Sequence, residues 1–245
     1  MRPLTTPELL RAWEHGLDRP LVERSLYLLR ASATVGEAEA AALSIGQRDA
    51  RLLQLREWMF GPRLVNTAIC PHCAERVEWE NDIRDLRLQP VLPSAAAPSF
   101  EMEADGFSIS FRLPTSADMA GLDASNSNTQ NAGILLQQCL LSVYKDDVEY
   151  TAATLPVHVL QSLEERMSKE DAQADITLLL TCPSCSHQWE SRFDILSYLW
   201  SEINSWATHV LREVYLLAKA FGWSEQDILA MSPQRRQLYL EMIRA

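Results

Sequence analysis

Two short stretches that lie far apart in the chain decide its organisation: Ile69-Cys70-Pro71-His72-Cys73 and Thr181-Cys182-Pro183-Ser184-Cys185. Each is a Cys-Pro-x-Cys sequence that follows an apolar approach and precedes a tryptophan. A Cys-x-x-Cys turn brings two sulfurs to about 2.3 Å from one metal ion, and two such turns supply the tetrahedral ligand set of a structural zinc. Proline in the second position fixes φ and tightens the turn. We therefore predict that four cysteines bind one structural Zn²⁺: Cys70, Cys73, Cys182 and Cys185.

The two turns are then the halves of one zinc ribbon, with residues 74–181 between them. Closing so long a loop costs roughly 4 kcal/mol plus a constant. Structural zinc contributes on the order of 10–16 kcal/mol in isolated fingers. We therefore expect the metal ion to hold the front and the back of the molecule together.

Other uses of these cysteines stay open at this point. A single Cys-x-x-Cys can be a redox pair or form a disulfide, and thiols can also be unrelated buried groups. His72 and His187 lie near enough in sequence to replace a cysteine as ligand. Because cysteine fills all four positions, the metal is expected to be structural, since a catalytic zinc keeps an open position. Cys139 lies in an apolar run and is interpreted as a small buried hydrophobe.

The composition limits the possible functions. The 245 residues carry a formal net charge of −11 and 47% hydrophobic residues, enough for one large or two modest domains. The acidic balance disfavours general nucleic-acid binding, which needs a basic surface. The sequence has no signal-peptide pattern and no run of 18 apolar residues, so we expect a soluble, cytoplasmic protein without a membrane segment.

The expected fold is α+β and mostly helical, in three parts that form one compact unit. Residues 1–63 form a helical segment, 64–193 hold the zinc ribbon with an insertion at about 90–175, and 194–245 form a second helical segment. An alternating pattern predicts a strand at 107–113, and strands are also predicted beside the cysteine turns, at 76–79, 174–181 and 188–193. Residues 82–88 are a further strand or turn, 90–99 a mobile linker, 125–131 a polar loop and 134–143 an apolar helix. Apolar residues at helical spacing predict a long helix from 194 to 221, ended by Gly222.

The C-terminal part resembles a known family. The matching pieces are Glu202-Ile203 to Glu213-Val214, Phe221-Gly222-Trp223-Ser224-Glu225, Ile228-Leu229 and Arg235-Arg236-x-x-Tyr239-Leu240. Together with Ser44-Ile45-Gly46-Gln47-Arg48-Asp49, the two cysteine pairs and Phe111-Arg112-Leu113-Pro114-Thr115-Ser116, they resemble the baseplate or baseplate-hub assembly proteins of contractile-tailed (T-even-like) phages and of phage-derived contractile injection systems.

The resemblance implies a non-enzymatic assembly chaperone or structural component of the baseplate hub, with baseplate or hub proteins as partners. It implies a place in the host cytoplasm or in the assembled particle. We find no catalytic constellation: no Ser/His/Asp arrangement has a convincing spacing. The alternative is a zinc-ribbon nucleic-acid-binding or transcription-associated protein, although Glu75, Glu78, Glu80 and Glu190 surround the turns.

Four residues near the C-terminus are candidates for binding a partner protein: Trp223, Arg235, Arg236 and Tyr239. Arginine and aromatic side chains are common at interfaces and supply much of their binding energy. The two arginines are expected to form a compact positive spot on an acidic protein. The alternative interpretation of the tryptophans, including Trp200 and Trp206, is that they fill the core.

Overall fold

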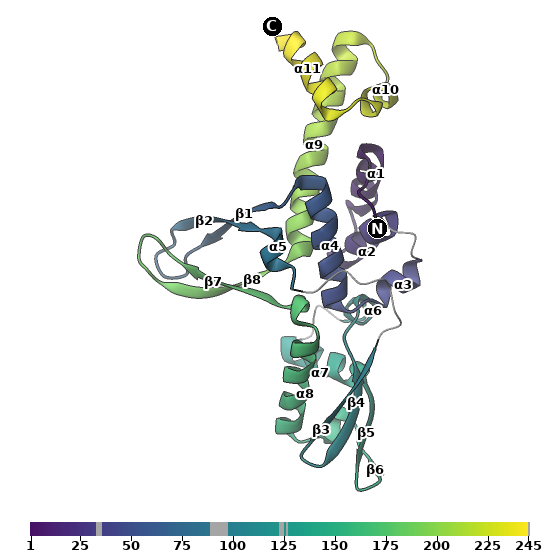
Figure 1. The fold of residues 1–245 in the computed structure, drawn as a ribbon, viewed down its shortest axis with the longest axis vertical. Helices are drawn as coiled ribbons and strands as arrows, with labels where there is room; N and C mark the ends of the chain where they lie inside the picture. The colour runs from purple at the N-terminus through teal and green to yellow at the C-terminus, as the bar shows by residue number, and fades with distance from the viewer. Residues whose placement is uncertain (33–35, 89–97, 123–124, 126, 245) are drawn as a thin grey trace.

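A single long helix, α9 (Ile195–Phe221), runs through the molecule and the other parts attach to it (Figure 1). The structure is a computed structural model that describes residues 1–32, 36–88, 98–122, 125 and 127–244. An arm of two hairpins projects to one side of α9, a lobe of sheet and helices lies below it, and two short helices form a head at its C-terminal end. The predicted mixed α+β fold with a majority of helix is confirmed.

The helical core joins the two ends of the chain. It contains α1 (Thr6–Gly16), α2 (Leu21–Ser32), the short α3 (Glu37–Ala41), α4 (Ile45–Phe60) and α9. Their apolar faces bury leucines and isoleucines between them: Leu9, Leu28, Leu29, Leu52, Leu53, Leu55, Ile195, Leu199 and Ile203. The indole Nε1 of Trp13 also donates to Asn204 Oδ1 at 3.0 Å. Direct helix packing therefore joins front and back, and the expected metal ion would add a second connection between them.

The arm consists of two antiparallel hairpins that form separate two-stranded sheets. One pairs β1 (Arg63–Ile69) with β2 (Arg76–Asp82), which runs into the one-turn helix α5 (Ile83–Leu86). The other pairs β7 (Ile176–Thr181) with β8 (Gln188–Phe193). No backbone ladder joins the hairpins among the described residues. Their tips meet through the cysteine turns and the neighbouring tryptophans Trp79 and Trp189.

The lobe is a four-stranded antiparallel sheet with helices on it. The strand order is β3 (Ser99–Ala104), β4 (Phe107–Arg112), β5 (Leu140–Lys145) and β6 (Val148–Glu149). The helical elements are α6 (Ser116–Ala120), α7 (Asn128–Cys139), α8 (Val157–Glu170) and the 3₁₀ turns η1 (Ala152–Thr154) and η2 (Ala172–Ala174). Apolar residues of alternate strand positions pack with α8 into a second core, which includes Phe107, Ile109, Phe111, Val143, Val159 and Leu163.

A buried polar junction fixes the lobe to the helical core. The carboxylate of Asp171 accepts from the Gly46 backbone N–H at 2.9 Å and from the Ser44 hydroxyl at 3.1 Å. Both donors belong to the N-terminus of α4, where free N–H groups favour an anion. The Ile45 N–H donates to the Pro114 carbonyl at 3.1 Å. The junction thus uses the first turn of α4 as a shared binding point for two segments of the lobe.

The head contains α10 (Glu225–Ala230) and α11 (Pro233–Arg244), which fold back on the end of α9. Gly222 ends α9 in the left-handed conformation with φ 71°, as expected for its position. The Ser224 side chain accepts from the Asp227 N–H and caps α10. A third apolar cluster joins the three helices through Val210, Leu217, Ile228 and Leu240.

Most predicted strands are confirmed, and the larger corrections lie in the insertion. Residues 128–139 form α7 and residues 140–145 form β5, so the predicted loop at 125–131 and helix at 134–143 have wrong boundaries. The Ser127 capping box starts the helix inside the polar stretch, and pairing with β4 converts the apolar run into a strand. Residues 83–86 are helical rather than a strand. The predicted linker at 90–99 lies outside the described residues except Pro98 and Ser99.

Candidate functional site

The two cysteine turns have the same local structure. Cys70 N–H donates to the Glu75 carbonyl at 2.9 Å, and Cys182 N–H donates to the His187 carbonyl at 2.9 Å. Ala74 and Ser186 follow the second cysteine of each turn, and both have left-handed φ, 61° and 59°. The two turns are therefore similar in backbone conformation as well as in sequence.

All four predicted ligand sulfurs lie together at the tip of the arm, within 4.8 Å of one another. The Sγ of Cys70 is 3.7 Å from that of Cys185, and the Sγ of Cys73 is 3.6 Å from that of Cys182. A tetrahedral ion with metal–sulfur bonds of about 2.3 Å requires sulfur–sulfur separations of about 3.8 Å. The donor set and its spacing therefore fit a tetrahedral metal ion, and these residues could hold one.

The pKa values of the clustered thiols shift in opposite directions. Burial raises the pKa of Cys70, but hydrogen bonds from the backbone at Cys73 and His72 outweigh that effect and lower its pKa. A hydrogen bond from the backbone at Glu75 lowers the pKa of Cys73, but the neighbouring thiols and desolvation outweigh it, so that this pKa is raised. Adjacent thiolates repel one another, so the cluster holds all four in the ionised form only when a positive ion shares the site.

The two histidines beside the turns do not complete the tetrad. The His72 and His187 rings stack on each other with centroids 5.4 Å apart, and neither belongs to the group of ligand atoms within 4.8 Å of one another. The four positions of a tetrahedral ion are already supplied by cysteine. Cys139 is 1% exposed in the lobe core, as predicted for a small hydrophobe.

The arginines of the arm are paired with carboxylates. Arg63 contacts Glu80, Arg76 contacts Glu78 at 3.1 Å, and Arg192 contacts Asp175 at 3.3 Å. Phosphate binding would have to compete with these pairs and with the surrounding acidic side chains.

The predicted partner-binding residues lie on the head, where they have different exposures. Trp223 stacks on Phe221 with centroids 4.5 Å apart, and Tyr239 meets Trp223 edge-on at 4.8 Å. The exposed guanidinium of Arg235 lies 5.7 Å from the centre of the Tyr239 ring. Trp223, Arg235 and Tyr239 therefore form one aromatic–cationic cluster that we call the aromatic patch.

Arg236 lies elsewhere and is not part of an exposed positive spot. It is 2% exposed, its Nε donates to Glu213 Oε2 at 2.9 Å, and its Nη1 donates to the Met231 carbonyl at 2.9 Å. This side chain holds α11 to α9. Trp200 and Trp206 pack partly buried against the helical core, in agreement with the core interpretation.

The geometry of arm, core and lobe can be compared with known proteins. A model of the family described as T4 bacteriophage base plate protein matches residues 28–200. The chain belongs to this family. The match includes both cysteine turns, the whole lobe and the first part of α9, and it supports a structural role in a phage baseplate. No curated protein and no solved structure is significantly similar to the chain.

Three side chains that position this baseplate protein's parts were missed by sequence reasoning. Asp171 joins lobe to core, Glu213 joins α9 to α11, and Tyr198 joins α9 to the arm, where its hydroxyl donates to the Val65 carbonyl at 3.1 Å and accepts from the Val65 N–H at 3.0 Å. Each acts on a partner distant in sequence, and no local pattern marks such pairs. Within the described ranges, no helix is both long and apolar enough to span a membrane.

Proposed function

We propose that this protein is a non-enzymatic component of the baseplate hub of a contractile phage tail or injection system, as a structural part or as an assembly chaperone. The observation that carries the proposal is the family match over residues 28–200. Its shape agrees with such a role, because arm, lobe and head project from one helical core and offer separate surfaces to neighbours (Figure 1).

The metal in this proposal is a structural Zn²⁺ bound by Cys70, Cys73, Cys182 and Cys185. Four thiolates with near-tetrahedral spacing are the donor set that zinc prefers in structural sites. The ion would join the tips of two hairpins that share no backbone ladder within the described residues. The arm would then be a rigid projection whose direction is set by the metal at the tip and by Tyr198 at the base.

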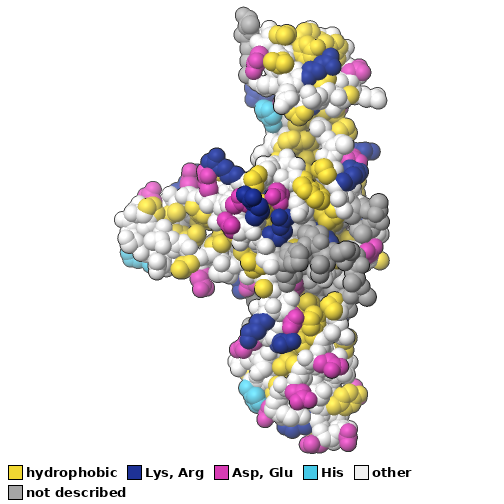
Figure 2. All heavy atoms as spheres, viewed as in Figure 1, with side chains coloured by type: hydrophobic (Ala, Val, Ile, Leu, Met, Phe, Trp, Pro, Cys, Tyr) yellow, Lys and Arg dark blue, Asp and Glu magenta, His cyan; other side chains and the backbone are white. Residues whose placement is uncertain are grey.

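The aromatic patch is the proposed docking site for a hub protein. Aromatic and arginine side chains that are partly exposed and already ordered by one another lose little entropy on binding. In Figure 2 apolar side chains gather over α10 and α11 at the top of the molecule. The alternative nucleic-acid role is disfavoured by the net charge of −11 and by the paired arginines of the arm.

Mass spectrometry of purified particles and of assembly intermediates tests the role. A structural part is found in finished particles, whereas a chaperone is found in intermediates and not in particles. Absence from both would contradict the proposal.

Co-purification with hub proteins tests the docking site. We expect Trp223→Ala and Arg235→Glu to reduce recovery of hub proteins, and Lys169→Glu, an exposed charge reversal on the lobe, to leave it unchanged. Equal recovery from all three variants would remove the aromatic patch from the proposal without affecting the family assignment.

A further inference from the structure

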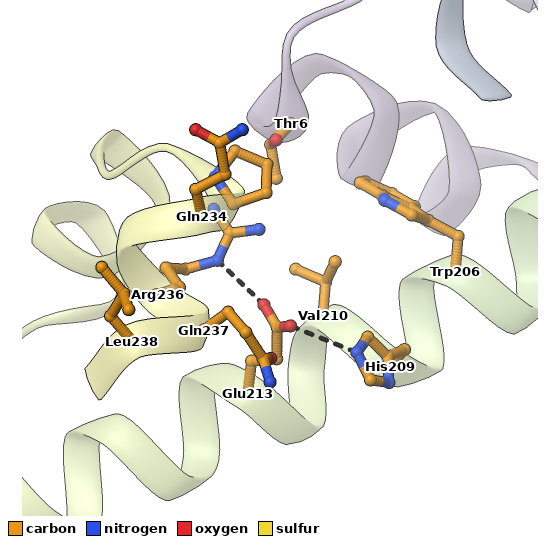
Figure 3. A pocket seen from close by; sticks show the side chains of 10 residues that line it. Thr6, Trp206, His209, Val210, Glu213, Gln234, Arg236, Gln237 and Leu238 are labelled. Atoms are coloured by element: carbon orange, nitrogen blue, oxygen red, sulfur yellow. Dashed lines mark hydrogen bonds and ion pairs between the residues drawn. The ribbon is translucent and has the colours of Figure 1, made fainter. Parts of the chain in front are cut away.

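A groove of about 650 Å³ runs between α9 and α11 on the head (Figure 3). Its walls are largely apolar or amide: Trp206, Val210, Pro233, Gln234, Gln237 and Leu238. Thr6, the first residue of α1, closes one end. A groove of this size is within the range of natural binding sites.

The charges in the groove are satisfied internally. Glu213 lies at its floor, where one carboxylate oxygen accepts from Arg236 and the other lies 3.1 Å from His209 Nε2 (Figure 3). Glu213 and Arg236 are 8% and 2% exposed, so neither charge is free to select a charged ligand. The charges at the floor therefore do not select a charged occupant, and the apolar wall residues Trp206, Val210, Pro233 and Leu238 favour an apolar one.

An apolar ridge stands beside the groove on the same helix. Leu238 and Met242, one turn apart on α11, are 58% and 66% exposed. Residues four apart share one face of a helix, so the two side chains form a continuous strip. Leu238 belongs to both the ridge and the groove wall. A surface that carries a ridge and an adjoining groove is suited to pairing with itself around a two-fold axis.

We propose that two copies of this chain associate through α11, with the Leu238–Met242 ridge of each copy seated in the groove of the other. The two α11 helices run antiparallel and cross near Leu238. Arg235 lies three residues before Leu238 and Glu241 three residues after it, about 4.5 Å in each direction along the helix axis. An antiparallel crossing therefore brings Arg235 of one copy level with the partner's Glu241, twice in each dimer.

Charge complementarity selects a second copy as the occupant. The whole chain carries −11 charges, so two copies repel each other over most orientations. On this face the buried charges are paired and the exposed ridge is flanked by one positive and one negative side chain. Arg235 and Glu241 are both exposed, and they contact the side chains of Tyr239 and Gln237 on the same helix at 3.4 Å. Both side chains can reorient toward a partner at a small cost in free energy.

Sedimentation velocity of the full chain over a concentration series tests the pairing. We expect the wild type to shift from monomer to dimer. Leu238→Glu should weaken association at least tenfold, because it places a charge in an apolar groove. Arg235→Glu and Glu241→Arg should each weaken it several-fold by like-charge contact, and the double variant should restore it, because the pair is then reversed. Lys169→Glu, on the lobe, should have no effect.

The substituted side chains of α11 and Lys169 of α8 are all exposed, so circular dichroism should show an unchanged fold. A wild type that stays monomeric up to about 100 μM, or a dimer that Leu238→Glu leaves intact, would overturn the pairing. The antiparallel arrangement would be overturned if the double variant did not regain the affinity that Arg235→Glu and Glu241→Arg each lose. None of these results bears on the presence of the protein in particles, so the baseplate role is tested separately. Arg235 also belongs to the aromatic patch, so Leu238→Glu and Glu241→Arg, which leave that patch unchanged, are the variants that separate the pairing from hub docking.

Discussion

Arg56 of α4 and Glu202 of α9 form a two-point ion pair that joins the first and last thirds of the chain. The Nε of Arg56 lies 2.8 Å from Glu202 Oε2, and its Nη2 lies 2.7 Å from Oε1. The Arg56 side chain is 3% exposed and that of Glu202 is 27% exposed. The pair belongs to the core that α4, α1 and α2 form on α9, and it joins α4 to α9 directly.

We expect removal of Glu202 and removal of Arg56 to lower the free energy of unfolding by different amounts. Glu202→Ala leaves a buried guanidinium without its counter-ion and should lower the free energy of unfolding by about 3 kcal/mol. Arg56→Met fills the space with an apolar chain and leaves a carboxylate that water can reach, so the loss should be about 1–2 kcal/mol. Chemical denaturation measures both.

The exposed pair Arg19–Glu23 is the matched control. Glu23→Ala should cost less than about 0.5 kcal/mol, because exposed pairs contribute little. An equal loss for Glu202→Ala and Glu23→Ala would contradict a structural role for the buried pair.

Removing the metal should loosen the arm and leave the core folded. We expect the wild type to bind one zinc per chain by elemental analysis, and Cys182→Ser to lose most of it. In hydrogen exchange, the strands β1, β2, β7 and β8 should lose protection in the variant or after chelation. The buried faces of α4 and α9 should keep theirs, because direct packing joins them.

Cys139→Ser provides the control, because Cys139 lies in the lobe core and away from the tip of the arm. It should retain the zinc and the protection of the arm. Collapse of α9 protection on chelation would show that the metal holds the whole molecule together after all.

Asp49 should make stability fall as the pH rises. Burial raises its pKa to about 6, against the lowering effect of Arg48, whose Nε donates to its carboxylate at 2.7 Å. In the unfolded chain the pKa is about 3.9. Below pH 4 the group is protonated in both states and carries no penalty, and above pH 6 it is ionised in both and the burial penalty is complete. The penalty amounts to up to about 3 kcal/mol between these limits.

The variant Asp49→Asn stays neutral and should lack this decrease. Its stability relative to the wild type should therefore rise from pH 4 to pH 7, measured by urea denaturation at each pH. Taking the difference cancels the other carboxyl groups, including Glu8, Asp82 and Asp118, whose pKa values are lowered and whose effect has the opposite sign. A difference that does not change with pH would contradict the assignment.

The sequence predicted those features that depend on neighbours in the chain. The cysteine turns, strand β8 and helix α9 follow from local spacing, capping and periodicity, and the structure confirms them. The change from α7 to β5 inside an apolar run was not predictable in this way, because pairing with β4 decides it. The same holds for Arg236: its sequence neighbours predict an exposed cation, and only the position of Glu213 on α9 explains its burial.

The orientation of the arm, the lobe and the head on the helical core depends on contacts between residues that are distant in sequence. Gly46 provides the sharpest test of such a contact. It lies in the first turn of α4, where a Cβ atom would be 2.1 Å from Asp171 Oδ1 and 3.0 Å from the Ala174 backbone nitrogen. Asp171 cannot withdraw without giving up its bonds to Ser44 and to Gly46 itself. Gly46→Ala should therefore destabilise the protein by about 1–3 kcal/mol through overpacking and loss of the bound carboxylate.

Gly133 is the matched control, since it is also helical, in α7, and a Cβ atom added to it would meet nothing within 4 Å. Gly133→Ala should stabilise by up to about 1 kcal/mol, because alanine is the better helix former. Thermal unfolding compares the two, and hydrogen exchange at residues 44–48 and 171–174 shows whether the junction itself opens. If Gly46→Ala were neutral and the junction stayed protected, Asp171 would not be what holds the lobe against α4.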